Sequence, residues 1–378
     1  LAAVSTQAED LHAEAKPQGG DWRAESKPQG GDWPAFRHDR KRSSVTDEKV
    51  APPLDRIWIF RSQSARLAPK FTGNLYADVT PEHNRTTLPV TAAGNSLFFT
   101  SQSEGRLVCL DAATGKIRWQ FVAGAGIQRA ATIAGGRVYT GSDDGYAYCL
   151  DAATGAVVWK HKAAPADRWF FSYGRMVSAW PVRTDIVIDP DADSGRLTAY
   201  FGAGIFPHDG TFLYAVDAKT GELVWRNDVT CETNFRYSLS PNGHLYVTGN
   251  HIYVPMDFKS FRWGIFNAYR RKDGSHNNWG GGDPENPGNN NGADFAPLVG
   301  AQKDGIRYFG NSAAPEGAAT NRASPWRAET PGYQTDLGSI QGIHPGVRGA
   351  PIQYDPDLCP VIYSGGFVYH IAFKPDPS

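Results

Sequence analysis

The sequence has few cysteines, few methionines and no long hydrophobic run. Its 378 residues include 4 Cys and 2 Met, and neither C-x-x-C nor C-x-x-C-H occurs. Four cysteines are too few for a disulfide-stapled scaffold, and these missing motifs leave no sign of a zinc knuckle or a c-type haem. No apolar stretch approaches the roughly 20 residues of a membrane-spanning helix. A net charge of −1 supplies no basic excess for nucleic acid.

Turn-forming and aromatic residues are abundant instead. The chain holds 41 Gly, 26 Pro, 11 Trp, 16 Tyr and 19 Phe. Glycine and proline favour tight turns, and aromatic residues favour strands. This composition favours many short strands over long helices, and all-β proteins of this length commonly form one unit.

One sequence unit occurs three times, as RLVCLDAATGKIRW (106–119), YAYCLDAATGAVVW (146–159) and FLYAVDAKTGELVW (212–225). Each copy reads as a strand, a D-A-x-T-G turn and a strand ending in Trp. The Asp can accept backbone N–H bonds, the Gly can supply a positive φ, and the Trp can pack between neighbouring units. The predicted repeat residues are Asp111, Gly115, Trp119, Asp151, Gly155, Trp159, Asp217, Gly221 and Trp225.

Such units predict an all-β fold, a β-propeller of four-stranded blades. A single blade cannot bury both faces, so blades must stack into a ring. We expect first strands near residues 88, 128, 178, 237, 294 and 349, which gives six blades. A total of seven or eight blades is also possible, since a degenerate copy could occupy 311–348. A weaker copy is FNAYRRKDG (266–274), where R-R-K-D-G stands in place of D-A-x-T-G.

The two ends of the chain complement each other. Residues 349–378 read as three strands without a fourth, and LDRIWIFRS (54–62) reads as a lone strand that carries Trp58. Pairing the N-terminal strand with the C-terminal strands would close the ring and remove both free edges.

An 11-residue tandem duplication precedes this strand, because AEAKPQGGDWR (13–23) is repeated as AESKPQGGDWP (24–34). With little to bury, residues 1–33 are interpreted as an extended arm or linker, and 34–378 as the propeller. Trp22 and Trp33 are the candidate partner-binding residues, since an exposed Trp seldom lies in an arm without a partner surface. The alternative is a plain linker.

The D-A-A-T-G-x-x-x-W units resemble the repeat of pyrroloquinoline-quinone-dependent dehydrogenases, and equally that of propeller lipoproteins that help assemble outer-membrane proteins. The opening WPAFRHDRKRSSVT…PPLDRIW (33–58) looks like the start of many bacterial propeller proteins of this quinoprotein-like type. The resemblance implies a β-propeller in a periplasmic or extracellular compartment. It does not choose a function, because the family holds both enzymes and scaffolds.

The dehydrogenases of this family carry the quinone with calcium, and usually two adjacent cysteines. The cysteines here are Cys109, Cys149, Cys231 and Cys359, with no adjacent pair. Cys109 and Cys149 hold the same repeat position, and a sheet spacing of ~10 Å exceeds the ~7 Å Cα limit of a disulfide, so both should be free core residues. We therefore expect neither pyrroloquinoline quinone nor calcium, no other metal, and no catalytic residues.

The central channel is the remaining candidate site. Its candidate lining residues are Arg129, Trp180, Arg183, Arg236, Asp294 and Arg348. Converging arginines would form an anion-binding funnel, unless each pairs with a neighbouring carboxylate or carbonyl.

The leading interpretation is a non-catalytic binding or scaffold propeller. It would contact protein partners of a larger assembly through its arm and loops. The alternatives are a quinoprotein-type oxidoreductase, a small-ligand-binding propeller that uses the channel, and one domain of a larger enzyme.

Overall fold

The structure is a computed structural model whose described part is built from strands and loops. It describes residues 31–40, 42–49, 55–61, 90–172, 175–190, 195–205, 210–228, 241–248, 250–255, 266–275, 301–303, 306–309, 312–315, 362–364 and 367–369. The predicted all-β class is confirmed.

Three four-stranded antiparallel sheets contain the three close repeats, and in each the strands pair in chain order. The D-A-x-T-G turn joins the third strand to the fourth, and the repeat Trp lies on the fourth. The first sheet is β2 (Val90–Ala93), β3 (Ser96–Ser101), β4 (Arg106–Asp111) and β5 (Ile117–Val122); the second is β6 (Thr132–Ala134), β7 (Arg137–Gly141), β8 (Tyr146–Asp151) and β9 (Val157–Lys162); the third is β13 (Val187–Pro190), β14 (Leu197–Ala203), β15 (Phe212–Asp217) and β16 (Leu223–Asn227).

Three further sheets have three described strands each, and two small ones have two. The fourth sheet is β18 (Tyr246–Thr248), β19 (His251–Pro255) and β20 (Phe266–Arg270); the fifth is β21 (Ala301–Lys303), β22 (Ile306–Phe309) and β23 (Ser312–Pro315); the terminal sheet is β1 (Val45–Thr46), β24 (Ile362–Ser364) and β25 (Phe367–Tyr369). The small ones are the hairpin β10 (Trp169–Ser172) with β11 (Arg175–Ser178), and β12 (Arg183–Thr184) with β17 (Asn242–Gly243).

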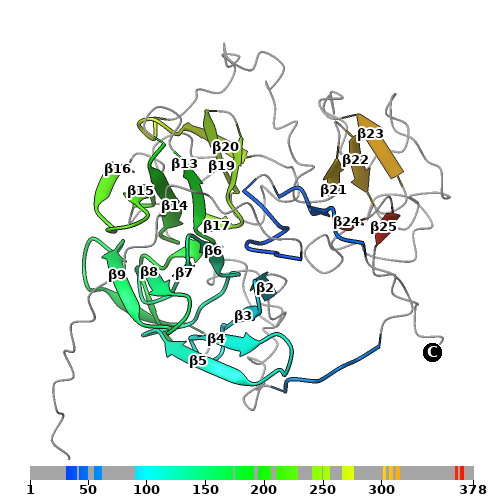
Figure 1. The fold of residues 1–378 in the computed structure, drawn as a ribbon. Helices are drawn as coiled ribbons and strands as arrows, with labels where there is room; N and C mark the ends of the chain where they lie inside the picture. Colours follow the sequence, from blue (N-terminus) through cyan, green and yellow to red (C-terminus); the bar gives the residue numbers. More distant parts are fainter. Residues whose placement is uncertain are drawn as a thin grey trace, which may run out of the picture.

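The sheets follow one another around a centre, where the N-terminal segment lies (blue in Figure 1). Their first strands are neighbours there, since β2 lies beside β6, β6 beside β13, and β13 beside β18. The first strand of each sheet is therefore the inner one.

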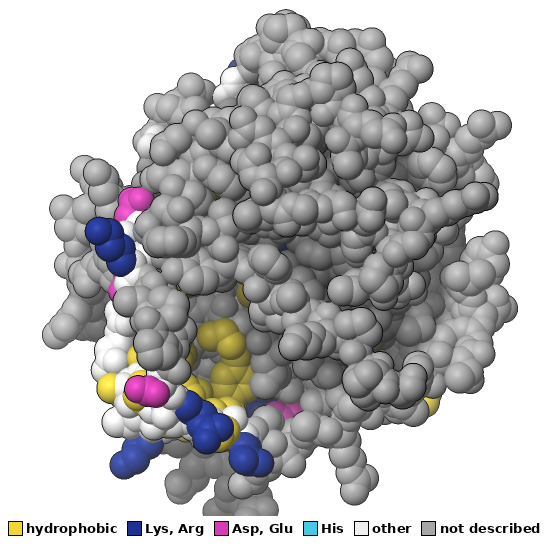
Figure 2. All heavy atoms as spheres, turned by 90° about the vertical axis from the view of Figure 1, so that its right-hand side faces the viewer, with side chains coloured by type: hydrophobic (Ala, Val, Ile, Leu, Met, Phe, Trp, Pro, Cys, Tyr) yellow, Lys and Arg dark blue, Asp and Glu magenta, His cyan; other side chains and the backbone are white. Residues whose placement is uncertain are grey.

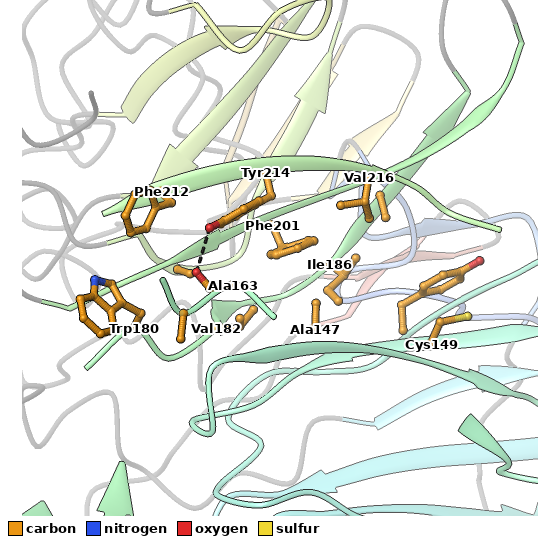
Figure 3. Close-up of a cluster of buried hydrophobic side chains, with 14 of the residues drawn as sticks. Ala147, Cys149, Ala163, Trp180, Val182, Ile186, Phe201, Phe212, Tyr214 and Val216 are labelled. Carbon is orange, nitrogen blue, oxygen red and sulfur yellow. Dashed lines mark hydrogen bonds between the residues drawn. The ribbon is translucent and has the colours of Figure 1, made fainter. Parts of the chain in front are cut away.

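The hydrophobic core lies between the faces of successive sheets. Figure 3 shows one such layer, where Cys149 of the second sheet and Phe201 and Tyr214 of the third belong to one buried cluster. The Tyr214 hydroxyl donates to the Ala163 carbonyl at 2.8 Å. Cys109 occupies the corresponding layer between the first and second sheets. Both cysteines are buried and free, as predicted.

The two chain ends meet, though in the described residues through a different strand from the predicted one. β1 pairs in parallel with β24, joining Val45 to Tyr363. The segment 55–61 has no strand assignment and lies along the first sheet, where Trp58 and Phe60 pack against a buried cluster of that sheet.

Candidate functional site

Four tryptophans make the same contact, each with a turn of the sheet that follows. Every indole nitrogen donates to a turn carbonyl, and the ring covers the turn glycine so closely that an added Cβ would lie within 2.4–2.8 Å of it. The hydrogen bonds are Trp58 to Ala112 at 2.9 Å, Trp119 to Ala152 at 3.0 Å, Trp159 to Ala218 at 3.0 Å, and Trp225 to Arg271 at 2.9 Å. Those of Trp119, Trp159 and Trp225 connect consecutive sheets, and that of Trp58 joins segment 55–61 to the first sheet.

The turns owe their shape to the Asp and Gly of the repeat. The Asp111 carboxylate accepts the Thr114 amide and hydroxyl, both at 2.9 Å. Gly115, with φ +69°, donates its amide to the Asp111 carbonyl at 2.8 Å. The bonds from Arg118 and Thr114 hold the pKa of Asp111 down at about 2. The carboxylate therefore stays ionised and keeps its turn bonds through the physiological pH range.

The degenerate R-R-K-D-G turn keeps the same backbone. Gly274 has φ +70° and donates to the Arg270 carbonyl at 2.8 Å, as Gly115 does to Asp111. Trp225 covers Gly274 in the usual way. The glycine and the incoming indole are thus common to all four turns, while the Asp and Thr are not.

Two of the candidate channel residues come together. Arg183 is buried and makes a two-pronged ion pair with Asp143, with Nε–Oδ1 and Nη2–Oδ2 distances of 2.8 and 3.1 Å. Arg129 donates from Nε to the Arg183 carbonyl at 3.1 Å. Both arginines are therefore engaged within the chain, one by a carboxylate and one by a carbonyl.

The other candidates are not brought to this pair. Trp180 lies in the hydrophobic layer between the second and third sheets (Figure 3), with the Arg168 guanidinium 4.8 Å above its ring. Trp33 exchanges two backbone hydrogen bonds with Ala92 of β2, at 2.8 and 2.9 Å. Trp22, Arg236, Asp294 and Arg348 lie outside the described residues.

A buried polar centre lies at the inner ends of the third and fourth sheets. Arg42 is 0% exposed and pairs with the carboxylate of Asp185, which is 1% exposed. Asp185 Oδ1 accepts the Leu245 amide at 2.8 Å. Asp185 Oδ2, which pairs with Arg42, also lies 3.1 Å from His244 Nδ1. The Phe36 ring stacks on His244 with centroids 3.4 Å apart.

Burial and charge shift the acidities in this centre. Burial alone would raise the pKa of Asp185, but the Arg42 charge and His244 outweigh it and hold the pKa below its usual value. Burial lowers the pKa of His244, and the charges of Arg129 and Arg42 act in the same direction, while Asp185 opposes them. The centre is therefore an arginine–aspartate ion pair beside a neutral histidine.

A second buried carboxylate lies four residues further along the chain. Asp189 of β13 is ion-paired with Arg40 and with Arg271 of the R-R-K-D-G turn. Arg271 also donates to the Pro190 carbonyl. Two arginines of the N-terminal segment thus reach two carboxylates of the third sheet.

Sequence reasoning missed this centre. Arg40 and Arg42 stand in a short basic run, D-R-K-R, that is more typical of a solvated surface. Asp185 and His244 carry no motif spacing. The chain separation of 143 residues between Arg42 and Asp185 leaves no local pattern to detect.

The described residues contain neither a metal-binding cluster nor a membrane-spanning helix. Within the ranges given above, no group of three or more His, Cys, Asp or Glu side chains is placed to hold a metal ion. Nor does any helix in that part of the chain have the length and apolar character needed to cross a membrane.

Radial four-stranded sheets joined by tryptophan–glycine contacts define the class of the protein as a β-propeller. Residues 55–204 match the family model described as outer membrane protein assembly factor BamB. Over these residues the chain is similar to this family of PQQ-type repeats, and the resemblance predicted from the sequence is confirmed there. No curated protein has a significantly similar sequence.

The solved structures to which the chain is similar include BamB from Moraxella catarrhalis and two quinohemoprotein alcohol dehydrogenases. BamB is 20% identical over 48% of this chain and 45% of its own, with a TM-score of 0.33. The Comamonas testosteroni enzyme is 14% identical over 75% of this chain and 47% of its own, with a TM-score of 0.45. The Pseudomonas putida enzyme ADHIIG is 13% identical over 66% and 40%, with a TM-score of 0.43. The chain spans less than half the length of each of these structures.

Proposed function

We propose that this chain is a non-catalytic binding propeller that contributes protein contacts to a larger assembly in the bacterial envelope, periplasmic or extracellular. The family model it matches is named for an outer membrane protein assembly factor, which supports a role in assembly and an envelope location. The observation that carries the proposal is an exposed apolar hairpin, β10–β11, on an otherwise well-packed part of the ring.

One face of this hairpin is apolar and exposed. Phe171 lies directly opposite Met176, and Trp169 follows on the same face because side chains alternate along a strand. These three side chains are 72%, 52% and 40% exposed, respectively. On the other face Val177 is buried, so the hairpin is fixed to the ring by one side only. Clustered exposed aromatic side chains are typical of protein-binding surfaces.

Basic side chains on the hairpin and on the strand before it support an acidic partner. Lys160 comes from β9 and Arg175 from β11. The Lys160 ammonium lies 5.2 Å from the centre of the Tyr146 ring, and Arg175 donates to the Gln102 carbonyl at 2.6 Å. On the described part of the face drawn in Figure 2, hydrophobic side chains likewise line a hollow beside Lys and Arg. A partner with an apolar centre and an acidic rim would complement the hairpin.

The described axial residues do not fit a quinone held with calcium. The carboxylates that could coordinate the ion are Asp143, Asp185 and Asp189, and each is paired with an arginine of this chain. We therefore propose a function that needs neither pyrroloquinoline quinone nor calcium. Stabilisation of the chain by the two together, read as a thermal shift, would instead favour the oxidoreductase or ligand-binding alternative.

We also propose that the ring is closed and has at least six blades, with residues 54–62 as the fourth strand of the terminal sheet. Trp58 supports this. It makes with the first sheet the contact that Trp119, Trp159 and Trp225 make from the fourth strands of their own sheets. By the same geometry, Trp58 belongs to the outer strand of the preceding blade.

The test of the binding function is recovery of the native assembly with a tagged full-length chain. Phe171→Ser with Met176→Ser should weaken partner binding by about 30-fold or more, because loss of a central aromatic anchor costs about 2 kcal/mol or more. The partner would be identified by mass spectrometry in the wild-type assembly, and its affinity measured by titration.

The matched control is Val157→Ser with Val158→Ser, at exposed positions of β9. It should leave affinity within about twofold, since isolated exposed apolar residues contribute little. A partner retained equally by both double variants would contradict the hairpin as the binding surface. Removal of residues 1–30 tests in parallel whether the arm that carries Trp22 adds to the same contact.

A further inference from the structure

The described residues of segment 31–49, here called the strap, cross the centre of the ring. Trp33 pairs with Ala92 of the first sheet, and the Pro34 carbonyl accepts the Ile133 amide of the second sheet at 2.7 Å. The Val247 amide of the fourth sheet donates to the Arg40 carbonyl at 3.0 Å. Further on, β1 joins the terminal sheet. Figure 1 shows this blue segment lying between the inner strands.

Arg42 of the strap is 0% exposed, and all three nitrogens of its guanidinium donate hydrogen bonds. Nε donates to the Leu245 carbonyl at 2.8 Å, and Nη1 donates to the Phe36 carbonyl at 3.0 Å. Nη2 donates to the Asp185 carboxylate. Separate acceptors for all three nitrogens match the fixed fork of a guanidinium, whereas the single nitrogen of a lysine ammonium would not reach all of them.

The acceptors of this socket come from two different sheets. Asp185 precedes β13 of the third sheet, and Leu245 precedes β18 of the fourth. Asp185 accepts the Leu245 amide at 2.8 Å, which helps to hold its carboxylate toward Arg42. Without the Arg42 guanidinium the buried carboxylate would keep only the Leu245 amide and His244, and losing the arginine of a buried ion pair is strongly destabilising.

The duplication in the N-terminal region offers a natural comparison. Gly-Asp-Trp occurs at 20–22 and again at 31–33, and the second copy begins the strap. Nine residues after Trp33 stands Arg42, whereas nine residues after Trp22 stands Gly31. Of the two copies, the second is therefore the one followed at this spacing by the arginine that fits the socket.

We propose that the inner ends of the third and fourth sheets form a guanidinium-binding socket, and that its ligand is Arg42 of the chain's own strap. The socket binds a planar guanidinium through Asp185 and the Leu245 carbonyl. Filling it from within the chain joins the third and fourth sheets, whose described strands do not pair with each other.

The test is chemical rescue of the full-length Arg42→Ala variant. This variant should unfold about 5 °C or more below the wild type, because it leaves a buried carboxylate unpaired. Added n-propylguanidinium at millimolar concentration should restore part of that loss in a saturable way, since it replaces the deleted group. n-Propylammonium should not, because it has the charge without the planar fork.

Controls and a second variant keep the outcome decisive. The wild type and Arg226→Ala, an exposed arginine paired with Asp228, should show no saturable gain with n-propylguanidinium. If Arg42→Ala fails to fold, the neutral pair Arg42→Gln with Asp185→Asn replaces it, and should be more stable than Arg42→Gln alone. The proposal would be overturned by equal rescue with both cations or by no rescue with either. It would also be overturned if Arg42→Gln alone were more stable than Arg42→Gln with Asp185→Asn.

Discussion

At the scale of single residues, the contact between a tryptophan and a glycine connects the sheets. The indole covers the turn of the next sheet, and the glycine both takes a positive φ and leaves room for the ring. Either property alone would favour glycine. Because they coincide at Gly115, Gly155, Gly221 and Gly274, the cost of a side chain there has two separable parts.

A pair of glycine substitutions separates the two parts. Gly155 and Gly136 have φ of +74° and +72°, but an added Cβ would lie 2.6 Å from the Trp119 ring at Gly155 and meet nothing within 4 Å at Gly136. Gly136→Ala should cost about 1–2 kcal/mol from backbone strain. Gly155→Ala should cost about 1–3 kcal/mol more, because the indole must move. Chemical denaturation of both variants measures the difference, and equal losses would mean that the indole contact is soft.

His244 should make stability depend on pH in a defined direction. Its pKa is lowered in the folded state, mainly by burial. The folded state therefore disfavours the proton, and stability is lost as the pH falls below the unfolded value of about 6.5. Asp185 opposes this effect, while Arg42 and Arg129 reinforce it.

The measurement is urea denaturation between pH 7.5 and 5.5. A histidine of this kind adds up to about 1.4 kcal/mol of loss per pH unit. His244→Gln should reduce the slope without abolishing it, because burial also lowers the pKa of His161. His161→Gln should remove a further share. A slope unchanged in His244→Gln would contradict a neutral histidine beside the ion pair.

At the scale of elements, the sequence was most informative where the repeat is intact. The alternation of the strands and the D-A-x-T-G turns predicted the first three sheets, since both signals are local. The R-R-K-D-G turn shows that local chemistry can change while the element persists. There Gly274 and Trp225 suffice, and Arg271 gains a new partner in Asp189.

The hairpin β10–β11 was not predicted. Its sequence, WFFSYGRMVS (169–178), follows the second repeat without a turn signature of its own, apart from Gly174. Apolar alternation cannot say which face of a hairpin meets the ring. Burial of Val177 and exposure of Phe171 are decided by the neighbouring sheets.

At the scale of the whole molecule, the proposed closure of the ring would couple the terminal sheet to the first sheet through Trp58. Trp58→Ala removes an indole held by the Ala112 carbonyl and packed on Gly115. Loss of a packed aromatic side chain costs about 3 kcal/mol or more. If residues 54–62 complete the terminal sheet, backbone hydrogen exchange should rise both in β4 and in β24–β25.

Two comparisons make this readout specific. Trp225→Ala should raise exchange in β16 and β20 and spare β24–β25, because its contact lies between the third and fourth sheets. Ile59→Ala, at an exposed position beside Trp58, should change little. Unchanged exchange of β24–β25 in Trp58→Ala would show that the closing strand lies elsewhere.

The sequence by itself determined the repeating unit, its turns and the family, because each depends on residues within about one blade of each other. Only the tertiary structure decided that Arg42, which stands in a basic run, is buried inside the ring. It also decided that Arg129 and Arg183, two of the four arginines proposed for the channel, are engaged within the chain. The reason is physical. A buried ion pair is set by which charges the fold brings together, and Arg42 and Asp185 stand 143 residues apart with no periodicity between them.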